Sequence, residues 1–122
     1  GLAEYNAVKF SLCICDFWAT LNYDIMADLM TEVTGKEWTA DDMAAVGRRV
    51  INIARAFNQR EGFNRKDDTV PKRIVKEALK SGPAAGQVIP EEAFNDMLDQ
   101  YYSVMCWDKN GMMPQDLIDS LL

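Results

Sequence analysis

The stretch TADDMAAVGRRVINIARAFNQREG, residues 39–62, decides the fold of this chain. Thr39 can accept a first-turn amide hydrogen bond, and Asp41 and Asp42 favour the positive end of a helix dipole. Gly62 ends the run. The apolar residues recur at steps of three and four, which is typical of one helical face: Met43, Val46, Val50, Ile53 and Phe57. The pattern predicts a long helix with this stripe towards a core and with Arg48, Arg49, Asn52 and Arg55 on other faces.

One residue inside this predicted helix is unfavourable for it. Gly47 costs about 1 kcal/mol relative to Ala in a helix interior. A close approach of a second helix at Gly47 would be a reason to carry a residue without a side chain.

Helical signals continue on the N-terminal side. Asn22 can act as an N-cap, and Gly35 stands where a left-handed C-terminal cap is needed. The residues between them have helical spacing: Ile25, Met26, Leu29, Met30 and Val33. Residues 3–19 mix alternating and continuous apolar runs, so the pattern alone does not separate helix from strand. A buried helix, or a helix followed by a turn, is favoured there.

The C-terminal half also indicates helices. Pro71 opens a short helical stretch that extends to Leu79, and residues 81–90 form a loop rich in Gly and Pro. Pro90 fits a first helical position, Asn110-Gly111 is a turn dipeptide, and Pro114 starts a last short helix. Two apolar groups follow these signals: Phe94, Met97, Leu98, Tyr101 and Met105, then Leu117, Ile118, Leu121 and Leu122. The sequence predicts an all-α fold with five or six helices in one compact domain, residues 1–122.

Composition excludes several functions. The chain has 122 residues, with 13 basic and 19 acidic side chains and a formal charge of −6, which argues against a nucleic-acid surface. It has no His, which removes Ser-His-Asp and Cys-His catalysis. Its three Cys cannot supply the four thiolates of a complete zinc or iron–sulfur site. The odd, low Cys count fits a reducing, cytoplasmic compartment, and no apolar run predicts a membrane span.

The three cysteines admit two interpretations. Cys13 and Cys15 form a C-x-C pair, and the simplest interpretation is two small buried side chains, because free Cys is among the most buried residue types. The alternative is that one thiolate ligates a metal whose other ligands lie outside this chain. Cys106 is most simply a core residue.

Two further clusters have alternative interpretations. Residues 55–68 are dense in Arg, Asn and Asp, and the simpler interpretation is a solvated helix end with surface ion pairs worth at most about 1 kcal/mol each. The alternative is that Arg55, Arg60 and Arg65 reach buried carboxylates or an anionic group. The aromatic cluster of Tyr101, Tyr102 and Trp107 predicts core packing more than a binding platform.

Several segments together resemble the C-terminal end of the aldehyde:ferredoxin oxidoreductase family, the tungsten-pterin enzymes. The central segment is VTGKEWTADDMAAVGRRVINIARAFNQREGFNRKDDTVPKRI, residues 33–74. It is similar to the family's TG-x-x-x-T block, Gly-Arg-Arg helix, FN-x-REG turn and DD-x-x-P-x-R segment. GPAAGQVIPEEAFNDMLDQYYSVMCWDKNGMMP, residues 82–114, resembles the family's YY-x-x-R-G-W-D helix end and following turn. SLCICDFW, residues 11–18, resembles its D-S-L-x-x-C segment.

The resemblance implies a role in a larger enzyme. In the family, helical C-terminal domains and a β-rich N-terminal domain enclose tungsten held by two pterin dithiolenes and a [4Fe–4S] cluster. The enzyme oxidises an aldehyde to a carboxylate and passes electrons to ferredoxin. The alignment implies that Cys15 is the fourth cluster ligand, with three ligands far upstream, and that Ser11, Leu12 and Ile14 lie near a pterin. No catalytic residue is implied for this chain.

Three positions depart from the family pattern. The Asp before Ser-Leu, a pterin-contacting position, is Phe10 here. The R-G of R-G-W-D is Met105-Cys106, which loses a cation and a flexible residue. Pro114 comes one residue later after Gly111 than the family's G-x-P turn would place it. The first two losses are consistent with a divergent substrate class or with different cofactor binding.

The expected function is therefore that of a fragment, inactive and without cofactor when isolated, which helps to close the pterin and cluster site. Its expected partners are the remaining domains of the same enzyme, ferredoxin and an aldehyde substrate, with neither nucleic acid nor membrane. A homo-oligomer is compatible with this role. The alternative is a free-standing helical module, derived from such an enzyme, that uses exposed apolar surface for protein–protein contact.

Overall fold

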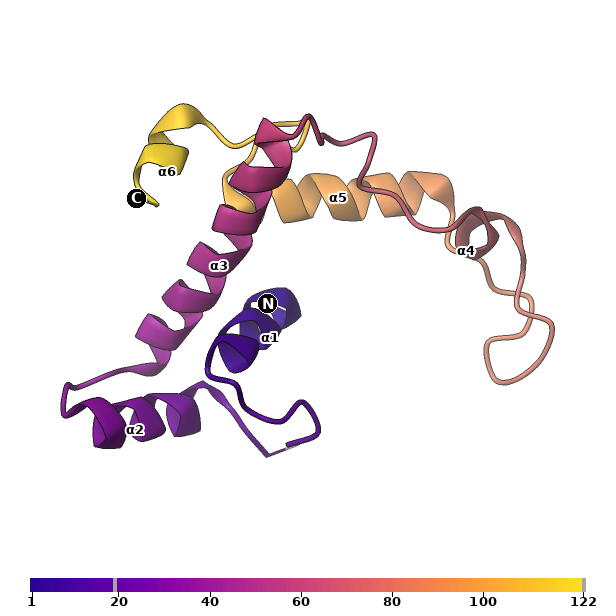
Figure 1. Cartoon of the computed structure of the whole chain (residues 1–122). Helices are drawn as coiled ribbons and strands as arrows, with labels where there is room; N and C mark the ends of the chain where they lie inside the picture. The colour runs from indigo at the N-terminus through magenta and orange to yellow at the C-terminus, as the bar shows by residue number, and fades with distance from the viewer. Residues whose placement is uncertain (19, 122) are drawn as a thin grey trace. The chain divides into compact units, whose positions relative to one another are not determined.

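A computed structural model of the chain describes residues 1–18 and 20–121, and this part of the chain folds into six α-helices without a strand (Figure 1). The helices are α1 (Leu2–Ser11), α2 (Tyr23–Thr34), α3 (Ala40–Arg60), α4 (Lys72–Lys76), α5 (Glu91–Met105) and α6 (Gln115–Asp119). The all-α prediction is confirmed. The helices belong to two compact units, Gly1–Phe57 with Ile118–Leu122, and Asn58–Leu117. The assignment of residues 1–122 to one domain stays a prediction, and Leu122, expected among the apolar residues of the last helix, lies outside the described residues.

Side-chain caps set the limits of α2 and α3. Asn22 Oδ1 accepts a hydrogen bond from the Ile25 amide at 2.8 Å, and Gly35 ends α2 in the left-handed conformation at φ +69°. At the start of α3 the Asp42 carboxylate accepts from the Thr39 amide at 2.8 Å and from its hydroxyl at 2.7 Å. The Thr39 Oγ1 accepts from the Asp42 amide at 3.2 Å in return. The caps predicted at these positions are confirmed.

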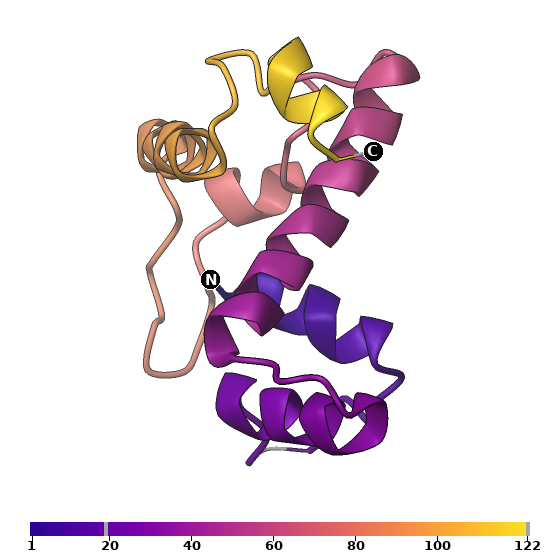
Figure 2. The ribbon, with the colours of Figure 1, turned by 90° about the vertical axis from the view of Figure 1, so that its left-hand side faces the viewer.

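Helices α1 and α3 of the first unit touch at Gly47. A Cβ atom added there would lie 2.2 Å from the Glu4 carbonyl oxygen and 2.8 Å from its carbonyl carbon. Figure 2 shows α1 crossing the N-terminal half of α3. Beside the crossing, Arg48 Nε donates to Glu4 Oε1 at 2.9 Å. The predicted close helix–helix approach at Gly47 is therefore confirmed, and its partner is α1.

The core of the first unit lies around this crossing. Five buried side chains form it: Val8, Leu21, Met26, Ala27 and Met43. Half-buried side chains pack against it: Tyr5, Leu12, Ile14, Tyr23, Ile25, Met30, Trp38 and Val46. The core thus joins α1, α2, the N-terminal half of α3 and the segment between α1 and α2.

The predicted core face of α3 is wrong in its C-terminal half. Val50, Ile53 and Phe57 are exposed, whereas Asn52 and Arg55 are buried. The periodicity defines an apolar face of the helix, but it does not say which face other elements cover, and in this half the covered face is that of Asn52 and Arg55. The core of the first unit reaches only to Val46 and Gly47 on α3. Leu29 and Val33 on α2 are likewise exposed although their spacing predicts burial.

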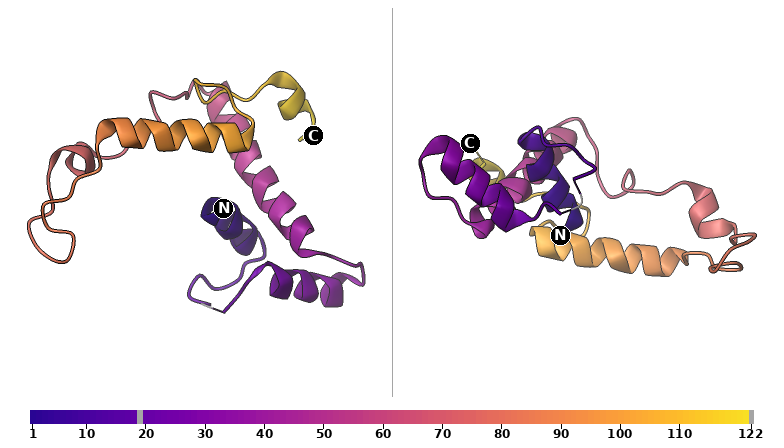
Figure 3. Two further views of the ribbon diagram at one scale, coloured as in Figure 1. Left: turned by 180° about the vertical axis from the view of Figure 1, so that it is seen from behind. Right: turned by 90° about the horizontal axis from the view of Figure 1, so that it is seen from below.

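The second unit contains α4 and α5, and Figure 3 shows α4 beside the N-terminal end of α5. The short helix ends at Lys76 and does not reach Leu79 as predicted. The Leu79 amide instead donates to the Gln87 carbonyl at 3.0 Å, and its carbonyl accepts from Gly86 at 2.8 Å. These contacts within the loop replace helical ones.

α5 also differs in detail from its prediction. Pro90 is the N-cap residue and not the first helical residue. Along the helix, Tyr102 and Met105 are buried, but Met97, Tyr101 and Val104 are exposed. The predicted apolar stripe is therefore only partly a core face.

None of the helices in the described part of the chain combines the length and the apolar character that a membrane crossing requires.

We expect Gly47→Ala to destabilise the chain, because the added methyl group would collide with the backbone of α1. Overpacking of this kind costs about 1 to 3 kcal/mol. Helix propensity alone predicts the opposite sign, a gain of about 1 kcal/mol. Urea unfolding followed by circular dichroism measures the difference. Ala54→Gly, at an exposed position of the same helix, is the matched control for propensity, and a more stable Gly47→Ala chain would contradict the contact.

We expect Asp42→Asn to lower stability at neutral pH. Hydrogen bonds from the Thr39 hydroxyl and then its amide lower the pKa of the Asp42 carboxyl below its ordinary value of 3.8. The carboxylate therefore stabilises the folded state fully above pH 3.8, and this contribution is lost as the pH falls through the lowered pKa. Unfolding free energies of the two chains should converge over that range. A gap that stays constant down to acid pH would contradict the cap.

Candidate functional site

The segment that resembles the cluster-binding motif forms a tight turn after α1. The Leu12 amide donates to the Val8 carbonyl at 3.1 Å, and the Cys13 amide donates to the Phe10 carbonyl at 3.0 Å. The Ile14 amide then donates to the Lys9 carbonyl at 3.3 Å. Cys13 adopts the left-handed conformation at φ +54°, which reverses the chain and ends the helix. The turn thus places Cys15 just beyond the C-terminal end of α1.

Side chains of this turn divide between core and solvent. Leu12 and Ile14 are half-buried and pack against the core of the first unit. Ser11, Cys13 and Cys15 are exposed, and Ser11 Oγ donates to the Ala7 carbonyl at 2.8 Å. Leu12 and Ile14 therefore anchor the turn, and the cofactor contacts expected of Ser11, Leu12 and Ile14 stay a prediction.

The interpretation of all three cysteines as buried side chains is wrong. Cys13, Cys15 and Cys106 are exposed free thiols. Cys106 caps α5 in the left-handed conformation at φ +60°, so it occupies a position that favours Gly and lies outside the core. The burial preference of free Cys is a statistical one, and at Cys13 and Cys106 the backbone requirement of a helix end prevails over it.

A buried lysine holds the far end of the turn. The Lys9 side chain is only 5% exposed, and its Nζ donates to the Asp16 carbonyl at 3.0 Å and to Asp16 Oδ1 at 2.6 Å. Its Nζ also lies 5.3 Å from the ring centroid of Tyr5 and 5.5 Å from that of Phe10. Sequence reasoning missed this group, because no local pattern pairs residues seven apart across a chain reversal.

Glu4 and Tyr23 are the other perturbed groups of this unit. The Gly1 ammonium lowers the pKa of the Glu4 carboxyl most strongly, burial raises it, and the Arg48 guanidinium lowers it further. Burial, with Glu4 and Tyr5 nearby, raises the pKa of Tyr23, whose hydroxyl has no hydrogen-bond partner among the described residues. The pKa of Glu4 is thus set mainly by its ion partners, and that of Tyr23 by its burial.

The described residues offer isolated thiols and no complete metal site. Nowhere in residues 1–18 and 20–121 do three or more Cys, Asp or Glu side chains gather closely enough to hold a metal ion. Cys15 is exposed on a turn whose backbone is fixed on both sides by hydrogen bonds. This geometry fits a thiolate that supplies one bond to a cluster completed by other segments.

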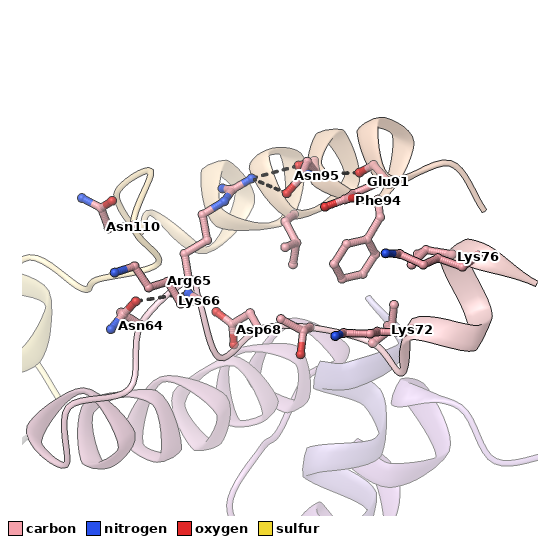
Figure 4. A pocket seen from close by; sticks show the side chains of 14 residues that line it. Asn64, Arg65, Lys66, Asp68, Lys72, Lys76, Glu91, Phe94, Asn95 and Asn110 are labelled. Atoms are coloured by element: carbon pink, nitrogen blue, oxygen red, sulfur yellow. Dashed lines mark hydrogen bonds between the residues drawn. The ribbon is translucent and has the colours of Figure 1, made fainter. Parts of the chain in front are cut away.

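The second unit contains a groove of about 590 Å³ between α5, α4 and the segment before α4 (Figure 4). Phe94 points into it from α5, and Lys72 and Lys76 reach towards it from α4. The ammonium groups of these two lysines make no ion pair or hydrogen bond with any described residue, and the same holds for the ammonium group of Lys66. The groove is therefore locally basic within a chain of net charge −6.

Arg65 at the edge of this groove is engaged within its own unit. Its guanidinium pairs with the exposed Asp99 carboxylate and donates to the Asn95 and Lys109 carbonyls at 3.3 and 3.2 Å. Arg60 pairs with the exposed Glu61 at 3.1 Å. For both, the simpler interpretation of surface ion pairs is confirmed. Arg55 is buried, unlike a residue of a solvated helix end.

The aromatic cluster of the second unit is mainly structural. Tyr102 is buried, its ring centroid lies 5.8 Å from that of Trp107, and its hydroxyl donates to the Asp68 carboxylate. Tyr101 packs edge-to-face on Trp107 at 5.6 Å but remains partly exposed. The prediction of core packing is confirmed for Tyr102.

Comparison with known proteins gives the class of protein to which this all-α chain belongs. The family described as "Aldehyde ferredoxin oxidoreductase, domains 2 & 3" matches residues 2–121. Tungsten-containing aldehyde ferredoxin oxidoreductases are similar to the chain: 31% identity over 102 residues in Pyrococcus furiosus and 32% over 111 residues in Pyrococcus horikoshii. These matches cover 83% and 90% of this chain, but only 16% and 18% of those relatives.

A more distant relative is the WOR-like subunit of an aliphatic sulfonate oxidoreductase from Pyrococcus furiosus, 26% identical over 117 residues, which are 91% of this chain and 19% of that protein. The match over nearly the whole chain defines its class: an all-α chain homologous to one portion of an oxidoreductase family. The chain belongs to the aldehyde ferredoxin oxidoreductase family and spans less than a fifth of the length of the curated relatives it matches.

We expect Cys13→Gly to stabilise the chain. The left-handed conformation costs an L-residue about 1 to 2 kcal/mol, and Gly removes this strain. Gly also has greater backbone entropy in the unfolded chain, which offsets about 0.5 to 1 kcal/mol of that gain in stability. Denaturant unfolding should therefore show a gain of up to about 1 kcal/mol. Cys13→Ala is the control, because it removes the thiol but keeps the Cβ. An equal gain in both variants would show that the thiol and not the backbone conformation is responsible.

Proposed function

We propose that the chain is the C-terminal portion of a tungsten-containing enzyme that oxidises aldehydes to carboxylic acids and transfers the electrons to ferredoxin. In this proposal Cys15 is one ligand of a [4Fe–4S] cluster, and the isolated chain is inactive. The observation that carries it is the exposed Cys15 thiol on a hydrogen-bonded turn, in a chain that matches domains 2 and 3 of the family from residue 2 to residue 121. The remaining domains would supply the other ligands.

The residues of this chain would present and shield one corner of the cofactor site. When bound, tungsten held by two pterin dithiolenes supplies two-electron oxidation of the aldehyde, and the cluster supplies one-electron transfer to ferredoxin. Cys15 would donate its thiolate, and Leu12 and Ile14 would fix the turn through their packing on the core. Burial and hydrogen bonds around the thiolate sulfur would set the cluster potential.

Phe10 bears on how the cofactor is bound. Phe10 occupies the position at which the family's D-S-L-x-x-C segment has a pterin-contacting Asp. Its side chain is exposed. A phenyl ring accepts no conventional hydrogen bond from pterin N–H groups, so this contact would be replaced by ring packing. Ser11 and the exposed backbone of the turn would then provide the polar contacts to the pterin.

A second candidate function is a helical interaction module, and the exposed apolar side chains favour it. On α5, Met97, Tyr101 and Val104 recur at helical spacing and are exposed together. Such a patch marks a protein interface, either with the other domains of the enzyme or with another protein. Size-exclusion chromatography of the chain with the separately expressed remainder of the enzyme distinguishes the two candidate functions. Co-elution would favour the chain's role as a portion of the enzyme over that of a free-standing module.

We expect Cys15→Ser in the full-length enzyme to lower the iron content and to bleach the visible absorption of the cluster, because one of its four thiolates is lost. Cys13→Ser, two residues away on the same turn, is the matched control and should retain both. Iron analysis and absorption spectra are compared with aldehyde-dependent dye reduction. Equal loss in both variants, or in neither, would contradict the assignment of Cys15.

A further inference from the structure

We propose that Lys9 is a positioning residue for the Cys15 ligand: its buried ammonium group holds the chain immediately after Cys15 and thereby fixes the direction in which the thiolate points. The inference rests on the proposed function, since it concerns the same ligand. It adds a residue outside the SLCICDFW segment to the site.

The contacts of Lys9 are specific to the ligand turn. Its Nζ lies 3.0 Å from the main-chain carbonyl of Asp16 and 2.6 Å from a carboxylate oxygen of the same residue. The first bond fixes the backbone, and the second is charge-assisted and therefore stronger than a neutral hydrogen bond. Both bonds converge on the residue that follows Cys15.

Burial makes these two bonds costly to lose. The Lys9 side chain is 5% exposed, whereas Asp16 is 58% exposed. A buried ammonium group without partners is strongly unfavourable, so Lys9 requires the acceptors that Asp16 provides. The rings of Tyr5 and Phe10 add cation–π contacts at 5.3 and 5.5 Å. Phe10, which departs from the family pattern, thus contributes to holding Lys9.

The clamp acts on a turn that is also fixed at its other end. The Lys9 carbonyl accepts from the Ile14 amide at 3.3 Å, so one residue contacts the turn before and after Cys15. Beyond the clamp, the Cys15 carbonyl accepts from the Trp18 amide at 3.3 Å. With main-chain bonds on both sides, little freedom remains at Cys15. Partners that orient a metal ligand in this way typically change metal affinity by 10- to 100-fold when they are removed.

The test is the lifetime of the cluster in full-length holoenzyme exposed to the iron chelator bipyridyl. Lys9→Met keeps the length and apolar stem of the side chain but removes the ammonium group. We expect it to shorten the half-life of the cluster absorption about ten-fold. Lys36→Met is the matched control, because Lys36 is an exposed lysine of the same unit that forms no ion pair with any described residue, and it should leave the half-life unchanged.

Two further readouts separate positioning from general destabilisation. Amide hydrogen exchange should accelerate at Trp18, which reports on the Cys15 carbonyl, while Met26 and Gly35 at the two ends of α2 keep their protection. The electron paramagnetic resonance spectrum of the reduced cluster should change in Lys9→Met, because the thiolate approaches iron from a different direction. Uniform acceleration of exchange, or an unchanged spectrum together with a wild-type half-life, would overturn the proposal.

A second variant decides the matter if Lys9→Met does not fold. Asp16→Asn leaves the main-chain acceptor in place and removes only the charge-assisted bond, so it should give a half-life between those of wild type and Lys9→Met. A wild-type half-life in Asp16→Asn would then overturn the proposal. The outcome also differs from failure of the proposed function: if Cys15→Ser retains its iron, the ligand assignment fails, whereas if only Lys9→Met and Asp16→Asn behave as wild type, the clamp alone fails.

Discussion

The first unit depends on the absence of a side chain at Gly47. A helix crossing in which one residue of α3 approaches the Glu4 carbonyl leaves no room for a Cβ atom, and this contact sets the distance between α1 and α3. The Arg48–Glu4 ion pair lies beside it, and Val8 and Met43 are buried in the same core. Gly is less favourable than Ala inside a helix, but at this position it allows the backbones of the two helices to pack directly against each other.

The α1–α3 crossing also determines where the candidate ligand Cys15 lies. The position of α1 fixes where the helix ends, and its last residues determine the turn that carries Cys15. Leu12 and Ile14 attach the turn to the core, and Lys9 holds Asp16, the residue that follows Cys15. The exposed Cys15 thiol therefore lies on a turn that is fixed on both sides of it. Such rigidity would suit the proposed role of Cys15 as one ligand of a cluster whose other ligands lie in the remaining domains.

Signals between near neighbours in the sequence predicted much of the fold. Features that depend on the packing of distant elements were not predicted. Asn22, Gly35 and the Thr39–Asp42 box act through hydrogen bonds within four residues, so their positions can be read from the sequence. The exposure of Ile53 and Phe57 and the early end of α4 depend on which elements lie nearby, and periodicity carries no such information. The same reasoning explains why a local motif could single out Cys15 as a candidate, whereas no local signal predicted the Lys9–Asp16 pair.

The sequence by itself determined the all-α class, the helix caps and the family to which the chain belongs, and it suggested a close helix contact at Gly47. Only the tertiary structure decided which apolar faces are covered, that the three thiols are exposed, and that the buried Lys9 ammonium group bonds to Asp16 in the turn that carries Cys15. The physical reason is how far apart along the chain the interacting residues lie. Capping and helical periodicity are interactions between near neighbours in the chain, whereas burial and the pairing of Lys9 with Asp16 arise only after the chain has reversed and packed.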